Sequence, residues 1–112
     1  MNEDLIVADS CNHSVRKVAL PDGRVTTVAG SVEGGRAGAG YADGTGTAAR
    51  FNCPNAVAVD GSNAILVADS FNNRVRKISG EGGVVTTVAG HSEEGKVDGT
   101  GPTARFNDPM ML

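Results

Sequence analysis

The chain has 112 residues, 39% of them hydrophobic and 21% charged, which is typical of one folded, soluble domain and excludes a disordered tail. Its formal net charge of −3 has the wrong sign for a general nucleic-acid-binding surface. The longest aliphatic runs are far shorter than the roughly 20 residues that a membrane-spanning helix needs. The sequence shows neither a membrane segment nor a signal peptide, and it predicts no compartment.

An internal repeat organises the chain. Residues 5–18 recur 60 positions later as residues 65–78, and the run Val-Thr-Thr-Val-Ala-Gly at 25–30 recurs unchanged at 85–90. A self-similar unit of this length, made of strand-forming runs, is close to the size of a propeller blade and too long for the common helical repeats. The repeat therefore indicates blades of β-sheet.

The linker that follows each repeat has its own motif. Asp-Gly-Thr-Gly at 43–46 returns at 98–101, an offset of 55, so the first linker carries five additional residues. These residues lie within the Gly/Ala-rich stretch 31–42, which predicts a surface loop. Short helical turns are expected at 45–51 and 100–106, with the phenylalanine at the end of each as an apolar plug.

Short runs rich in Val, Ile and Thr, bounded by Gly, Asn, Asp or Ser, predict four strands per repeat. Tight turns at 60–63 and 81–83 join them, so an antiparallel meander is the expected connection. In the complete repeat the strands are predicted at 56–60, 64–69, 74–79 and 84–89.

The predicted fold class is all-β, with two blades' worth of four-stranded antiparallel meanders in one segment. A blade of this kind buries its apolar face only against further blades or further copies. The expected boundaries are 1–30 for the last three strands of a first blade, 31–54 for a linker, 55–90 for a complete second blade, 91–109 for a second linker and 110–112 for the start of a further inner strand.

The sequence of the second repeat resembles the NHL-repeat family of β-propellers. That resemblance implies a propeller fold for almost the whole chain, while members of the family serve as protein-binding platforms, RNA binders or metal-dependent lyases. The residues that carry it are 56–60, 66–70 with Asn72, 75–78 and 85–90, preceded by the linker that runs from Asp43 to Pro54.

Two blades cannot close a propeller, which needs roughly four to eight. The chain is therefore expected either to be an excerpt of a longer polypeptide or to assemble with copies of itself head to tail. In the second case the last strand of one copy completes the blade that begins at Leu5 of the next, and three copies give six blades.

Polar residues that recur in both repeats are the candidate turn and pairing residues. Each aspartate follows an apolar strand and precedes an asparagine, which is typical of a carboxylate that accepts hydrogen bonds in a turn or pairs with an arginine. The alternative is a cation site. The residues are Asp9, Asn12, Arg16, Asp69, Asn72 and Arg76.

Four further residues, Asp43, Arg50, Asp98 and Arg105, are candidates for the loop surface. The two aspartates lie in the Asp-Gly-Thr-Gly motif, which loosely resembles part of a calcium-binding loop but lacks its other acidic ligands, so turns are predicted. The two arginines are expected to be solvated or to pair with aspartates.

The histidines and cysteines do not recur between repeats. His13 and His91 stand opposite Asn73 and Ser31, so no zinc site is predicted. The cysteines Cys11 and Cys53, which lack CxxC spacing, are expected to pack as small buried thiols, and the sequence leaves open whether they are bonded.

We therefore expect a non-catalytic scaffold with no catalytic, metal or cofactor site and no membrane contact. Its expected partner is itself, with three copies completing six blades and two or four copies as the alternatives, or a protein ligand. Two alternatives stay open: an excerpt of a metal-dependent, lyase-like propeller whose active site lies in absent blades, and an RNA-binding NHL surface, which is disfavoured by the shortage of exposed aromatic residues.

Overall fold

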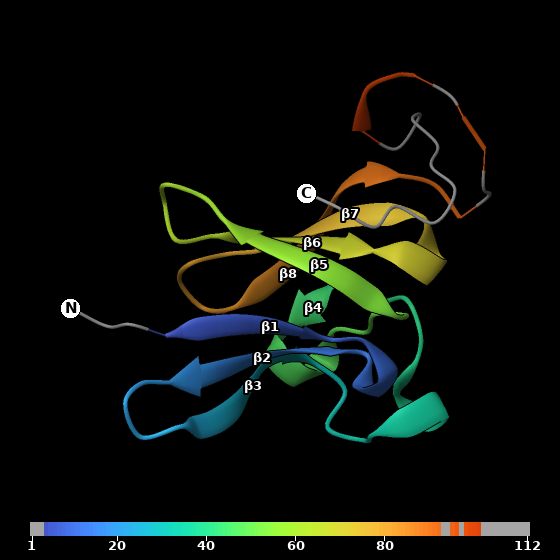
Figure 1. Cartoon of the computed structure of the whole chain (residues 1–112). Coiled ribbons are helices and arrows are strands. Elements are labelled where there is room, and N and C mark those ends of the chain that lie inside the picture. The colour runs from blue at the N-terminus through green and yellow to red at the C-terminus, as the bar shows by residue number, and fades with distance from the viewer. Residues whose placement is uncertain (1–3, 93–94, 97, 102–112) are drawn as a thin grey trace.

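Strand-forming runs of Val, Ile and Thr build two antiparallel sheets in the computed structural model, which describes residues 4–92, 95–96 and 98–101 (Figure 1). The first sheet, the first blade, has the order β1-β2-β3, and the second, the second blade, has the order β4-β8-β7-β6-β5. The strands are β1 (Leu5–Asp9), β2 (Ser14–Ala19), β3 (Arg24–Gly30), β4 (Gly44–Thr45), β5 (Pro54–Val59), β6 (Ile65–Asp69), β7 (Arg74–Ile78) and β8 (Val84–Gly90).

The predicted all-β class and the antiparallel meander are confirmed. Single 3-10 turns lie between these strands: η1 (Ser10–Asn12), η2 (Gly35–Gly38), η3 (Gly46–Ala48) and η4 (Ser70–Asn72). Turn η3 lies within the stretch 45–51, where a helical turn was expected. The inner strand expected at 110–112, and most of the second helical turn expected at 100–106, fall outside the described residues.

The two repeats fold in the same register. Val7 of β1 lies opposite Arg16, as Val67 of β6 lies opposite Arg76. The β2–β3 and β7–β8 pairs each have a bulge just before that arginine, with the extra residue, Val28 or Val88, in the facing strand. The equivalent arginines are therefore presented in the same way by both blades.

The turns between strands follow from local chemistry. Asp60 Oδ1 accepts hydrogen bonds from the backbone N–H groups of Ser62 (2.8 Å) and Ala64 (3.0 Å), which closes the β5–β6 hairpin. Its bonds to Ser62 and Ala64 hold the pKa of Asp60 below its usual value. Between β7 and β8, Gly82 and Gly83 take φ values of +78° and +64°, which a side chain would disfavour.

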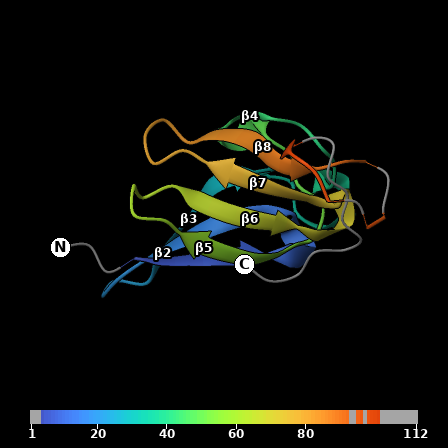
Figure 2. The same ribbon diagram turned by 90° about the horizontal axis from the view of Figure 1, so that it is seen from above.

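The hydrophobic core lies between the two blades and includes side chains from the first linker. Val15 and Ala29 of the first blade pack with Ala49 and Phe51 of the linker and with the apolar residues of the second blade. Phe51 has no exposed surface and acts as the apolar plug that the sequence predicts. Strands β1 and β5 are in contact at this junction, and Figure 2 shows the second blade lying over the first.

One expectation about the cysteines is wrong. Cys11 is exposed, because it lies in the middle of turn η1 between two strands rather than on a strand face, and Cys53 is only half-buried. Neither cysteine forms a disulfide bond among the described residues. Among the described residues, no helix is long and apolar enough to cross a membrane.

Candidate functional site

A buried ion pair lies at the centre of the second blade. Asp69 ends β6 and Arg76 lies in β7 next to the bulge of the β7–β8 pair, and Arg76 Nη1 donates to Asp69 Oδ2 at 2.7 Å. Neither side chain has any exposed surface. A buried pair of this kind is tolerated only when the remaining polar atoms are also hydrogen-bonded.

The first linker supplies most of those hydrogen bonds. Arg76 Nη2 donates to the Ala42 carbonyl and to Asp43 Oδ1, both at 2.9 Å, and Arg76 Nη1 also donates to the Arg50 carbonyl at 3.0 Å. Asn72 Nδ2 donates to the Gly40 carbonyl at 2.8 Å. One arginine and one asparagine of the blade thus bind the linker backbone at several points between residues 40 and 50.

An aromatic ring completes the contact. The Arg74 guanidinium lies 3.7 Å from the centroid of the Tyr41 ring, within the range of a cation–π interaction. The hydroxyls of Tyr41 and Thr87 are hydrogen-bonded at 2.6 Å, and Thr87 also donates to Asp43 at 3.1 Å. We call Asn72, Arg74, Arg76 and Thr87 the linker cradle of the second blade.

The linker also covers the outer edge of the second blade. In β4, Gly44 pairs with Val85 and Thr45 pairs with Val84 of β8. An uncovered edge strand invites pairing with another chain, so even a two-residue strand reduces that hazard.

Burial dominates the chemistry of the Asp69 carboxyl and raises its pKa above the usual value. Hydrogen bonds from Asn72 and from the Asn52 N–H, together with Arg76, act in the opposite direction. Oδ1 accepts from the Asn52 N–H and Oδ2 accepts from Asn72 and Arg76. Both oxygens therefore hold protein groups together, and neither is exposed to a substrate.

The first blade carries the same residue types with a different outcome. Arg16 Nη1 donates to Asp9 Oδ2 at 3.0 Å, and each side chain is 30% exposed. Asn12 Nδ2 donates to the same carboxylate at 3.0 Å. We call Asn12, Ser14, Arg16 and Thr27, which are equivalent to the linker-cradle residues, the first-blade cradle. These four side chains line a cavity of about 180 Å³ together with Ser31, Val32 and Gly34.

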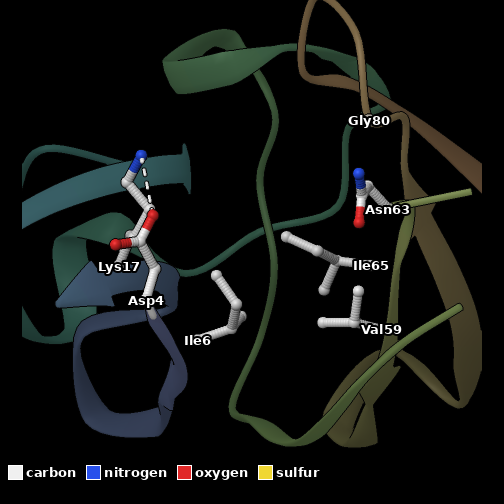
Figure 3. Close-up of a pocket in the computed structure, with 7 residues that line it drawn as sticks. All are labelled: Asp4, Ile6, Lys17, Val59, Asn63, Ile65 and Gly80. Carbon is white, nitrogen blue, oxygen red and sulfur yellow. Dashed lines mark ion pairs between the residues drawn. The ribbon is translucent and has the colours of Figure 1, made fainter. Parts of the chain in front are cut away.

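A larger, open cleft of about 770 Å³ lies between the blades at the hairpin end of the molecule (Figure 3). The first blade contributes Ile6 and a weak ion pair, in which Lys17 Nζ lies 3.8 Å from Asp4. The second blade contributes Val59, Ile65, Asn63 and Gly80. The two charges face each other and the remaining lining is mainly apolar, so the described residues gather no set of catalytic groups in this cleft.

The other candidate residues are dispersed. Arg50 Nη1 donates to the carbonyls of Thr47 and Ala49, Asp98 is exposed, and Arg105 lies outside the described residues. His13 is buried and its Nδ1 accepts the Cys53 N–H at 3.0 Å. No group of three or more His, Cys, Asp or Glu side chains suited to a metal ion occurs in the described part of the chain.

The sequence analysis did not predict the roles of two linker residues that contact the linker cradle. Tyr41 has no counterpart in the second linker, where Lys96 stands, and Asp43 was interpreted as a turn residue. The sequence does show that both residues of this ion pair recur, Asp43 as Asp98 and Arg76 as Arg16. The recurrence does not show that the aspartate of the linker pairs with the arginine of the blade.

The comparisons with known proteins agree with this architecture. Residues 51–78 match the sequence model of the NHL repeat. The chain is 39% identical over 108 residues to NHL repeat-containing protein 2 of Gallus gallus and 33% identical over 112 residues to that of Homo sapiens. Both alignments cover 96% of the chain but only 14% and 15% of the relatives, so it spans about a seventh of their length.

Solved structures show the same fold. A structural genomics protein of unknown function from Bacteroides thetaiotaomicron is similar over 96% of this chain and 26% of its own, with a TM-score of 0.85 and 30% identity. An auxiliary nutrient binding protein from Bacteroides ovatus is similar over 95% of this chain and 28% of its own, with a TM-score of 0.74 and 24% identity.

Repeated antiparallel blades joined by a structured linker define the chain as part of a repeat β-propeller. The family match identifies residues 51–78 as an NHL repeat, and the chain as a whole is similar to NHL repeat-containing proteins.

Proposed function

We propose that this chain is a non-catalytic NHL scaffold that associates head to tail with copies of itself, and that the assembled blades present their loops to a protein ligand. The NHL repeat supports an interaction scaffold of the propeller type. The engagement of Asp69 and Arg76 with the linker supports a structural role for the most deeply buried ionisable groups.

The observation that carries the proposal is an uncovered apolar face on the first blade. Leu5, Val7 and Val25 are 53%, 39% and 48% exposed, whereas their counterparts in the second blade are 7%, 0% and 1% exposed. Those counterparts, Ile65, Val67 and Val85, are covered by the linker and the first blade. Because the two faces share sequence and register, we expect the face of the first blade to be covered by a blade and a linker in the same way. A second copy of this chain can supply both.

The loop surface offered to a protein ligand lies at one end of the blades. Turns η1 and η4 are at the same end of the molecule (Figure 1), and each presents an exposed side chain at the equivalent position, Cys11 in the first blade and Phe71 in the second. Phe71 is 61% exposed. A large exposed aromatic side chain in a turn is suited to anchoring a partner protein.

The test is the solution mass, measured by size-exclusion chromatography with light scattering over a range of concentrations. We expect a discrete multiple of 11.3 kDa, with three copies forming six blades. Val7→Lys, which places a charge on the uncovered face, should shift the mass towards one chain. Leu20→Lys adds the same charge at an exposed position in the β2–β3 hairpin and should have no effect. A mass of one chain at every concentration would overturn self-association.

A further inference from the structure

The first-blade cradle is a vacant copy of a site that is filled in the second blade. Arg76 makes four hydrogen bonds, three of them to the linker, whereas Arg16 makes one, to Asp9. The Nε atoms of both arginines are buried and without a hydrogen bond among the described residues, so the difference lies in the terminal nitrogens. Arg16 lines the 180 Å³ cavity.

The occupant of the second-blade site defines what the vacant site would accept. It is the segment Gly-Tyr-Ala-Asp-Gly-Thr-Gly at 40–46, which offers two carbonyls and one carboxylate to Asn72 and Arg76. The first-blade cradle retains the asparagine, the arginine and the threonine, as Asn12, Arg16 and Thr27. It therefore retains the donors that recognise an Asp-Gly-Thr-Gly segment.

The chain contains a second segment of this sequence. Asp98-Gly99-Thr100-Gly101 matches residues 43–46, and Asp98 is exposed and forms no ion pair among the described residues. Gly101 lies near the Val88 carbonyl of β8, as Gly46 lies near the Val28 carbonyl of β3. The two glycines thus stand in the same position relative to the last strand of their respective blades.

We propose that the Asp98–Gly101 segment of one copy binds the first-blade cradle of a second copy, with Asp98 paired to Arg16. This inference rests on the proposed self-association and names the contact that gives it direction. A charge-assisted hydrogen bond forms between the exposed carboxylate and the partially exposed guanidinium. It lies on the same face as Val7 and Val25, so the polar contact and the apolar cover belong to one interface.

One difference between the two sites fits this pairing. Tyr41 stacks on Arg74 in the second blade, and both members of that pair are replaced together: Lys96 stands in the place of Tyr41 and Ser14 in the place of Arg74. The Tyr41 ring also lies 4.6 Å from the Arg76 guanidinium, whose equivalent Arg16 is retained. The change from Arg74 to Ser14 therefore removes one of the two arginines that a lysine at this position would face, and it lowers the repulsion that Lys96 would meet in the first-blade cradle.

The test is a double-mutant cycle on the association constant, measured by light scattering and sedimentation. Asp98→Asn and Arg16→Gln should each weaken association about tenfold or more, because each leaves the other partner uncompensated at an interface. The association constant of the double variant should be no smaller than that of the single variant that associates less tightly. Asp22→Asn, the same change at an exposed site in the β2–β3 hairpin, should leave the constant unchanged.

The outcomes separate the two proposals. Independent, multiplicative effects of Asp98→Asn and Arg16→Gln, or no effect of either, would overturn the pairing while the chain still assembles. A wild-type chain that is monomeric throughout would overturn both proposals and would mean that a different segment, such as the linker of a preceding repeat, fills the cradle. Circular dichroism of each variant checks that the blades remain folded.

Discussion

Two arginines at equivalent positions of the repeat have different surroundings in this molecule. Arg76 is fully buried between the second blade and the first linker, while Arg16 is 30% exposed and bonded only within its own blade. Both lie in the same register, next to equivalent bulges of the facing strands β3 and β8. The difference therefore comes from what covers each blade rather than from the blade itself.

This contrast shows that the second blade is completed by a segment that lies outside its own meander. Its own strands pair the aspartate with the arginine, but the other hydrogen bonds of the terminal nitrogens of that arginine are made to the preceding linker. The linker also brings Phe51 into the core and covers the edge of β8. The structural unit is thus a blade together with the linker before it.

The largest expected effect separates the two arginines directly. Arg76→Met leaves Asp69 buried without its cation and should lower the free energy of unfolding by about 3–5 kcal/mol. Arg16→Met removes a partially exposed pair and should cost less than about 1 kcal/mol. Urea denaturation of both variants, at concentrations below those of self-association, measures the difference. Equal losses in the free energy of unfolding would mean that burial by the linker does not make Arg76 more important for stability than Arg16.

A smaller effect is expected at the matched aspartates of the linkers. Asp43→Asn weakens a hydrogen bond to the buried Arg76 guanidinium, but the Asp43 side chain is 47% exposed, so we expect a loss of about 1.5 kcal/mol. Asp98→Asn should leave the unfolding of the dissociated chain within about 0.5 kcal/mol of wild type. A loss at Asp98 as large as that at Asp43 would show that Asp98 already has an intramolecular role.

The smallest expected effect concerns the pair that differs between the linkers. Tyr41→Lys gives the first linker the residue of the second and should cost about 1 kcal/mol, because it replaces a cation–π contact with a lysine beside Arg74. Adding Arg74→Ser reproduces the Lys96 and Ser14 combination and should recover part of that loss. Thermal unfolding of the single and double variants provides the measurement; strictly additive losses would contradict the pairing of these positions.

Much of the fold was predictable because its information is local or periodic. The strands of the second repeat follow from runs of Val, Ile and Thr such as those of β6 and β8, and the hairpins follow from Asp60 and from the glycines at 82 and 83. The recurrence of the segments showed which residues of the two blades are equivalent. The expected burial of Cys11 failed because the residue lies in a turn, where repeat matching gives no measure of exposure.

The linker contact was not predictable in the same way. Asp43 and Arg76 are 33 positions apart, and neither lies in a pattern that names the other as partner. Their distance depends on how the linker runs between two blades, and the additional residues of the first linker remove even the constant spacing of the repeat. A single sequence therefore suggests an Asp–Arg pair within each blade and does not reveal the second aspartate.

The sequence by itself determined the repeating unit, its strands and its turns, since β-branched runs and glycine-containing bends act over a few residues. Only the tertiary structure decided which arginine is buried and which is left accessible, because burial depends on the segment that packs over the blade. That packing joins residues far apart in the chain. It leaves an apolar face and an arginine of the first blade exposed, whereas the equivalent residues of the second blade are buried.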